Sequence, residues 1–312
     1  MNHYQIKDVA KLIQQGDASL QQRYDYKCQY YKTALEAGTE KIHFHDNSNA
    51  FSCEIDTSNK DNKLRTAYPY FYETHLHTSE ASACAGSTGG EMARACKEAG
   101  YSGIIVTNHN WHGNHCIDSS LPWEAWIESY CRGFEEAKKV GDEIGLDVFF
   151  GYEAGYQGTE FLIYGITKEW LMAHPEINDA SIPEQYQLVH EAGGMVIHAH
   201  PFREEPYIPE IRLFPKYVDG VEGINATQSN PRSQSHNNPE YDTRAIAYAS
   251  ENNLPITAGS DIHNIHLFGG GIAFRRKLKD IHDYCEAILS DEDYILTNGT
   301  TWFNKNGVPL ET

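Results

Sequence analysis

The fold is decided by the stretch Tyr70-Phe71-Tyr72-Glu73-Thr74-His75-Leu76-His77. It begins as an apolar run typical of a β-strand and ends in two histidines. Residues two apart on a strand point to the same face, so His75 and His77 can aim both rings at one point. A predicted strand ending in acidic or histidine residues recurs four more times. These segments are Thr107-Asn108-His109-Asn110, Gly151-Tyr152-Glu153, His198-Ala199-His200-Pro201 and Gly259-Ser260-Asp261-Ile262-His263.

The residue types in these segments indicate a metal site. Imidazoles and carboxylates are the ligands that Zn, Mn and Fe accept. One such pair is ordinary, and His43-Phe44-His45 is an example without partner segments. Five segments, each at the end of a strand, predict a multinuclear metal site.

The order of elements predicts an α/β barrel. Strands are expected over residues 70–75, 103–107, 147–153, 160–166, 195–199, 218–225 and 256–260, with helices between them. Capping boxes, Thr88-x-x-Glu91 and Ser181-x-x-Glu184, open two of these helices. Strands that alternate with helices form a mostly parallel sheet, and barrels of this kind carry their chemistry at the C-terminal strand ends. All five segments lie at those ends.

The first part of the chain has a different pattern. Apolar residues from Ile6 to Ile13 repeat at helical spacing, and a second helix is expected over about residues 20–37. We therefore divide the chain into a helical N-terminal extension, residues 1–66, and a main domain, residues 67–312, that contains the five segments.

Composition limits the number of domains and the cellular location that we expect for the protein. The chain has 312 residues, 40% of them hydrophobic, which is enough for one large domain or one domain with an appendage. No apolar run reaches the length of a membrane span, and the start lacks the pattern of a secretory signal. Seven scattered cysteines without a Cys-x-x-Cys pair favour a reducing, cytoplasmic location.

The formal net charge of −19 argues against a duplex nucleic-acid partner, which needs a basic surface. A small phosphorylated substrate can still be held by bound cations and a few arginines. The acidity itself is explained more simply by solubility. The sequence does not indicate the oligomeric state.

The five segments, in this order, resemble the PHP family, named for polymerase and histidinol phosphatase. The resemblance covers roughly residues 70–300. It implies a distorted (β/α)7-type barrel with two or three divalent metal ions, Zn, Mn or Fe, and hydrolysis of phosphoesters. It implies that one metal is bound by His75, His77 and Asp261, that Glu153 bridges to a second metal bound by His200, and that His109 and His263 bind a third or complete a binuclear site.

Three positions depart from the family pattern. Ser82 stands where many members have Asp or His, and Glu80 is then the nearest substitute ligand. Leu162 stands where many have His, and Glu160 on the same strand face is a candidate replacement. Asn108 stands where Asp is frequent.

Three further residues are candidates with alternatives. His198 is a catalytic group, a partner of a ligand, a substrate contact or a core histidine. Arg203 follows His200-Pro201-Phe202 and suits a phosphate, or it pairs with a neighbouring glutamate. Asn225 closes a strand and orients the substrate or a ligand, or serves in a turn.

The leading hypothesis is a metal-dependent phosphoesterase that hydrolyses a small phosphomonoester, such as a nucleotide or a sugar phosphate, through an activated water. Glu153, Asp261 and His198 are its catalytic candidates, and Arg203 and Asn225 its substrate contacts. The alternatives are an exonuclease-like phosphodiesterase, a non-catalytic metal-binding module and an amidohydrolase-like enzyme.

Overall fold

The computed structural model describes residues 3–4, 42–47, 50–55 and 61–310. In the first part of the chain it contains an antiparallel sheet of β1 (His3–Tyr4), β2 (Ile42–Asn47) and β3 (Ala50–Ile55), followed by α3 (Asp61–Ala67). The two helices expected before residue 38 lie outside the described residues. The helical extension therefore stays a prediction.

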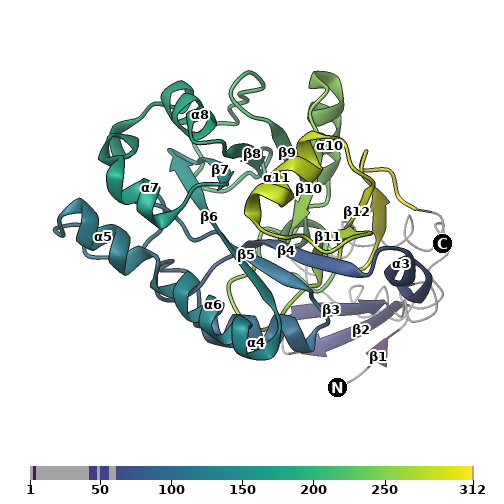
Figure 1. Ribbon diagram of the computed structural model, residues 1–312. Coiled ribbons are helices and arrows are strands. Elements are labelled where there is room, and N and C mark those ends of the chain that lie inside the picture. Colours follow the sequence, from purple (N-terminus) through teal and green to yellow (C-terminus); the bar gives the residue numbers. More distant parts are fainter. Residues whose placement is uncertain (1–2, 5–41, 48–49, 56–60, 311–312) are drawn as a thin grey trace.

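A curled sheet forms the centre of the main domain (Figure 1). Its ring contains β4 (Tyr70–Leu76), β5 (Gly103–Val106), β6 (Asp147–Tyr156), β7 (Thr159–Tyr164), β8 (Met195–Ala199), β9 (Gly220–Asn225) and β10 (Ile256–Gly259). Ile262, just beyond β10, closes the ring against β4, because its N–H donates to His75 O at 3.2 Å and its O accepts from His77 N at 2.9 Å. The distorted seven-stranded barrel is therefore confirmed.

One strand of the mostly parallel ring is antiparallel to both of its neighbours. The pairs β4–β5, β5–β6, β8–β9 and β9–β10 are parallel, but β7 is antiparallel to both β6 and β8. A tight turn through Gln157 and Gly158, both with positive φ, joins β6 to β7. The start of β7 therefore lies at the rim where the neighbouring strands end, and Glu160 is brought to that rim.

Three strands extend the sheet beyond the ring. They are β11 (Gly270–Phe274), β12 (Tyr294–Asn298) and β13 (Trp302–Asn304), all antiparallel to their neighbours. The first half of β4 pairs with β11, and its last residues pair with Ile262. This change of partner along β4 distorts the barrel, and the sequence analysis did not predict these strands.

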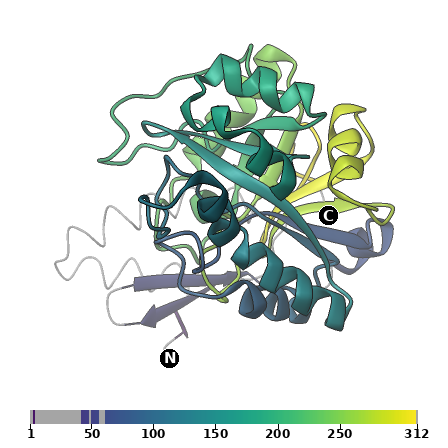
Figure 2. The ribbon, with the colours of Figure 1, turned by 60° about the vertical axis from the view of Figure 1, so that its left-hand side comes forward.

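Helices cover the outside of the ring, as Figures 1 and 2 show. They are α4 (Gly89–Glu98), α5 (Trp123–Tyr130), α6 (Arg132–Ile144), α7 (Lys168–Ala173), α8 (Ile182–Glu191), α10 (Glu240–Asn252) and α11 (Ile281–Leu289). Two shorter helices are η1 (Pro175–Asp179), between α7 and α8, and α9 (Ala226–Ser229), which directly follows β9 and is buried. Both predicted capping boxes form, at Thr88 with Glu91 and at Ser181 with Glu184. The single helix expected over 122–144 is divided at Cys131 into α5 and α6.

Glycines allow α4 and α6 to pack closely beside the opening motif. A Cβ on Gly89 would lie 2.0 Å from the backbone oxygen of Gly133, and one on Gly133 would lie 1.9 Å from Thr78 Oγ1. Only a residue without Cβ fits there. This contact fixes the loop after β4 against the helical layer.

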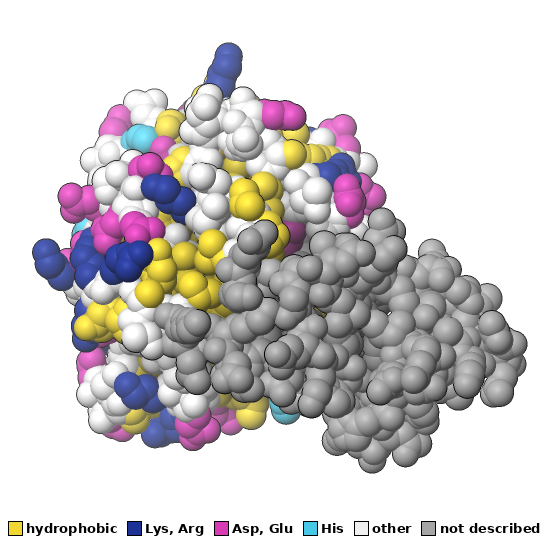
Figure 3. Space-filling model, turned by 90° about the vertical axis from the view of Figure 1, so that its right-hand side faces the viewer, with side chains coloured by type: hydrophobic (Ala, Val, Ile, Leu, Met, Phe, Trp, Pro, Cys, Tyr) yellow, Lys and Arg dark blue, Asp and Glu magenta, His cyan; other side chains and the backbone are white. Residues whose placement is uncertain are grey.

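Surface features agree with the overall composition. On the face shown in Figure 3, Lys and Arg side chains are interspersed with Asp and Glu around a hydrophobic area. Within residues 61–310 and the shorter described ranges, no helix has both the length and the apolar character needed to cross a membrane.

Candidate metal centre

The ring brings the five predicted segments together at one rim. Loops leaving β4, β5, β8 and β10 and the end of β6 supply the side chains there. The register extends beyond the strands, since Asn110 N donates to Glu153 O at 2.8 Å and Glu153 N donates to Asn108 O at 2.9 Å. Parallel strand ends meet at one edge, so the residues that end them become neighbours.

Glu153 lies at the centre of the site and is fully buried. Its Oε1 is 3.0 Å from His200 Nε2 and 3.3 Å from His75 Nε2, and its Oε2 is 2.7 Å from His109 Nδ1. The last pair is close but is not aligned as a hydrogen bond, which leaves Oε2 and Nδ1 without partners. A buried carboxylate surrounded by imidazoles from three strands is placed to bridge cations.

Asp261 provides a second buried carboxylate. Its Oδ1 lies 3.2 Å from His77 Nε2 and 3.5 Å from His75 Nε2 and has no hydrogen bond, while its Oδ2 lies 2.6 Å from Arg203 Nη2. Buried polar atoms are nearly always paired in proteins. The unpaired oxygens of Asp261 and Glu153 therefore fit cation ligands.

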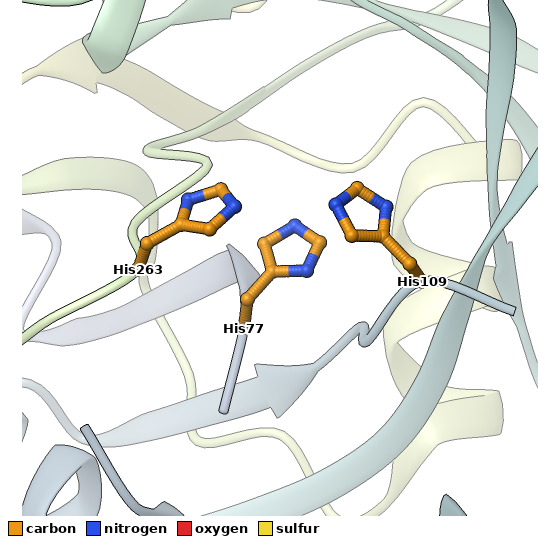
Figure 4. Close-up of side chains that lie close together, drawn as sticks. All are labelled: His77, His109 and His263. Carbon is orange, nitrogen blue, oxygen red and sulfur yellow. The ribbon is translucent and has the colours of Figure 1, made fainter. Parts of the chain in front are cut away.

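The donor atoms form overlapping groups of metal-binding size. In each group they lie within 4.8 Å of one another: His75, His77 and Glu153; His75, His200 and Asp261; His109, Glu153 and Glu160; and His77, His109 and His263. Figure 4 shows that the rings of the last group are near one another, from the β4 end and two loops. The donor set fits divalent metal ions such as Zn, Mn or Fe.

Two of these residues have left-handed backbone. His200 has φ 26° and Asp261 has φ 53°. Such conformations are strained for residues other than glycine and gather at functional sites. Ala199 lies in the barrel core, so strand alternation would point His200 outward. The left-handed backbone at His200 breaks this alternation, and His200 also faces the centre.

The imidazoles are oriented by partners on their other nitrogens. Glu222 Oε1 lies 2.8 Å from His75 Nδ1, and Glu222 Oε2 accepts from His200 N at 3.1 Å. Ser82 Oγ lies 3.1 Å from His77 Nδ1. Such partners fix the tautomer of a ligating histidine. The sequence analysis did not assign Glu222; a carboxylate inside the apolar strand Val221–Ile224 was the signal for it.

Electrostatics keep both central carboxylates ionised. Burial raises the pKa of Glu153, but the positive rings of His75 and His109 outweigh it, and the net pKa lies well below the ordinary value. Burial also raises the pKa of Asp261, and Arg203 and His75 lower it well below the ordinary range. Ionised carboxylates are the form that binds cations.

Of the two substitute carboxylates, the structure places only Glu160 in the cluster. Glu160 Oε2 is 3.6 Å from His200 Nε2 and Oε1 is 3.9 Å from His109 Nδ1. Glu80 instead accepts from Gly89 N at 3.0 and 3.1 Å, at the start of α4. The expectation that Glu80 is a ligand is corrected, because a helix N-terminus holds its carboxylate.

His198 is not brought to the centre. Its ring stacks on Phe161 with centroids 5.0 Å apart and lies 5.8 Å from the ring of Tyr248, on the outer side of β8. Burial lowers the pKa of His198 to about 3, so the ring is neutral near pH 7. His198 also lines the small cavity that Glu160, His200 and Arg203 share, and its catalytic role stays a prediction.

The Asn225 side chain forms hydrogen bonds with neighbouring residues. Its Oδ1 accepts from Thr227 N at 3.1 Å, which caps α9, and its Nδ2 donates to Glu222 Oε2 at 2.9 Å. The side chain is fully buried. It therefore orients Glu222, and a contact of Asn225 with substrate stays a prediction.

Arg203 is buried and held in place. With the Gln228 amide oriented to satisfy both neighbours, its oxygen accepts from Arg203 Nε at 3.2 Å and its nitrogen donates to Asp242 Oδ1 at 3.2 Å. A small polar cavity beside the cluster is lined by Glu160, His200 and Arg203 among others. The predicted pairing of Arg203 with a neighbouring glutamate does not form; Asp261 is its partner.

No family model matches the sequence, and no curated protein matches it. Solved structures similar to this chain include a two-domain protein from Bacteroides vulgatus containing a predicted PHP-like metal-dependent phosphoesterase, at 13% identity and TM-score 0.48. The match covers 73% of this chain and 64% of that one, so this chain spans just under two thirds of its length.

Two further solved structures are similar. One is a candidate metal-dependent phosphoesterase from Bifidobacterium adolescentis, at 17% identity and TM-score 0.44, covering 71% of this chain and 96% of that one. The other is an amidohydrolase from Chromobacterium violaceum, at 14% identity and TM-score 0.42, covering 62% and 87%. These similarities are distant, so the chemistry of the site is what bears on function.

Proposed function

We propose that this protein is a metal-dependent phosphoesterase that hydrolyses a small phosphomonoester. The supporting observation is the buried Arg203, whose Nη2 lies 2.6 Å from Asp261 Oδ2 in a cluster built for cations. Arginine recognises phosphate through two parallel hydrogen bonds. An arginine held beside metal ligands suits a substrate that carries phosphoryl oxygens.

His75, His77, His200, Glu153 and Asp261 would hold two divalent ions, with Glu160, His109 and His263 completing the set. Divalent ions bound by such groups act as Lewis acids and lower the pKa of water toward neutrality. The two central carboxylates offset the charge of these ions. Arg203 binds the phosphoryl oxygens and stabilises their growing negative charge.

The fixed geometry of the arginine favours this function over cleavage of an uncharged C–N bond. Gln228 and Asp261 contact different nitrogens of the guanidinium, so its plane is set before a substrate binds. A hydrogen-bond donor that is already held in place, and that points to where charge develops in the transition state, contributes strongly to catalysis. An uncharged amide gives such a buried cation less to stabilise.

The test measures metal content by elemental analysis and phosphate release from a panel of phosphomonoesters. Wild type is compared with Glu153→Gln, which keeps the side-chain shape, and with Glu286→Gln on the exposed face of α11 as a control. We expect two or more metals per chain and turnover in wild type and control, with turnover lost in Glu153→Gln. Bound metal without phosphate release from any ester would contradict the proposal.

A further inference from the structure

Asp242 is a buried carboxylate on α10 to which the proposed function gives no role. The residue is 7% exposed. Its Oδ1 accepts from the backbone nitrogen of Asn225, at the end of β9, at 3.2 Å. The same oxygen accepts from the side-chain nitrogen of Gln228, on α9, also at 3.2 Å. One oxygen atom therefore holds two segments that lie beside the metal centre.

The orientation of the Gln228 amide follows from the chemistry of its two neighbours. A guanidinium carries only donors, so the amide oxygen faces Arg203, whose Nε lies 3.2 Å away. The amide nitrogen then faces Asp242. Gln228 is 1% exposed, and a buried polar group needs both of these partners. An amide accepts from the arginine and donates to the aspartate at once, which neither a carboxylate nor an apolar side chain does.

The second branch from Asp242 leads to the metal-facing histidines. Asn225 donates through its backbone to Asp242, and its Nδ2 donates to Glu222 Oε2 at 2.9 Å. Glu222 contacts the ring of His75 at 2.8 Å and the backbone nitrogen of His200 at 3.1 Å. Every group in this branch is buried, so water does not compete for these hydrogen bonds.

Both branches end on the same carboxylate of the cluster. Arg203 Nη2 lies 2.6 Å from Oδ2 of Asp261, and His75 Nε2 lies 3.5 Å from its Oδ1. The contacts therefore close a ring that holds the arginine at a fixed position relative to the histidine. Such positions matter for catalysis, since a misplacement of about 1 Å costs about 100-fold in rate.

We propose that Asp242 is a positioning residue for both halves of the site. Through Gln228 it fixes the guanidinium of Arg203, and through Asn225 it fixes Glu222 and the histidines that Glu222 contacts. The first half rests on the proposed function, whereas the second rests only on metal binding. Both partners of Asp242 Oδ1 are uncharged N–H donors, so the acceptor oxygen is required and the negative charge is not.

Gln228→Met tests the arginine half by itself. Methionine has a similar length but does not accept from Arg203. Binding of inorganic phosphate to the metal-loaded, full-length protein, measured by calorimetry, should weaken by roughly tenfold or more, the scale of a lost hydrogen bond to a charged group. Metal affinity, measured by competition with a chelator, should stay at the wild-type value. Gln187→Met, at an exposed glutamine on α8, is the control.

Two substitutions at Asp242 test the shared oxygen. Asp242→Leu removes the acceptor, and both phosphate affinity and metal affinity should fall by about tenfold or more. Asp242→Asn keeps an acceptor oxygen, and both affinities should stay within about twofold of wild type. Asp142→Leu, at an exposed aspartate on α6, is the control. Rescue by asparagine separates the position of an oxygen from a requirement for charge.

Unchanged affinities in Asp242→Leu, or equal losses in Asp242→Leu and Asp242→Asn, would overturn the inference. So would equal phosphate affinities in Gln228→Met and its control. If Asp242→Leu does not fold, Asn225→Asp tests the metal branch, because its carboxylate would oppose that of Glu222; unchanged metal affinity there would overturn that half. Wild type that binds metal but neither binds nor releases phosphate would remove the proposed function and the arginine half, and the metal affinities would still decide the histidine half.

Discussion

Oε1 of Glu222 lies 2.8 Å from Nδ1 of His75, and both side chains are fully buried. The same carboxylate accepts from the backbone N–H of His200 through Oε2, at 3.1 Å. From its position on β9, Glu222 therefore orients His75 and His200 but does not face the cluster itself.

Glu222→Gln should weaken metal binding. Gln keeps the shape of the side chain but removes the charge that makes the His75 ring a stronger donor. We expect metal affinity to fall by about 10- to 100-fold, measured by competition with a chelator. Glu204→Gln, which changes a glutamate paired with Arg244, is the control. Equal affinities in all three proteins would show that Glu222 does not tune the site.

Arg203→Lys should reduce turnover while metal content is retained. Lysine keeps the positive charge but lacks the planar fork that contacts both Asp261 and Gln228. On the proposed function we expect kcat to fall by about 100-fold. Arg244→Lys, at a guanidinium paired with Glu204, should leave kcat unchanged. An unchanged kcat in Arg203→Lys would remove the arginine from the mechanism.

His198→Phe should remove a pH-dependent loss of stability. The pKa of His198 is lowered by burial to about 3, whereas an unfolded histidine titrates near about 6.5. Between these values the unfolded chain binds more protons, so the free energy of unfolding falls as pH falls. The stabilisation that neutral His198 provides is fully present above the pKa of the unfolded histidine. About 2 kcal/mol of it is lost as the pH falls from 6.5 to 5.

The measurement is chemical denaturation at pH 7.5 and pH 5 in identical metal-loaded preparations, so that the metal contribution is common to all proteins. Between pH 7.5 and pH 5, the free energy of unfolding should fall by about 2 kcal/mol less in His198→Phe than in wild type. His266→Phe, at an exposed histidine, is the control. Parallel losses in wild type and His198→Phe would mean that His198 is protonated in the folded state.

Gly89→Ala and Gly90→Ala should have opposite effects, although they are adjacent in α4. A Cβ on Gly89 meets the Gly133 backbone oxygen at 2.0 Å, so the helices must separate, at about 2 kcal/mol or more. A Cβ on Gly90 meets only the side chain of Val140, at 3.3 Å, and alanine favours a helix by up to about 1 kcal/mol. Equal free energies of unfolding would contradict the close contact of α4 with α6.

Periodicity and spacing were enough to predict the barrel and most of its centre. Alternating strands and helices, with capping boxes at Thr88 and Ser181, are local signals that the fold keeps. Residues at the C-terminal ends of parallel strands become neighbours in any such barrel. His75, His77, Glu153 and Asp261 could therefore be named together before their distances were known.

The antiparallel β7 and the choice between substitute carboxylates were decided by tertiary structure. A strand pattern carries no direction, and only the tight turn at Gln157 and Gly158 reverses the chain and brings Glu160 to the rim. Glu80, nearer in sequence to the opening motif, is bound instead by the start of α4. Sequence distance from a motif does not measure distance from a site.

The sequence by itself determined which donor types meet at one rim, because residues that end parallel strands become neighbours at the same edge of a barrel. Tertiary structure decided which side chains face the centre. His198 and His200 are two apart on one strand, and alternation predicts one shared direction. The left-handed backbone at His200 turns only that ring inward, while His198 packs on Phe161. Such a conformation is held by the surrounding contacts and not by local preference, so no local pattern reveals it.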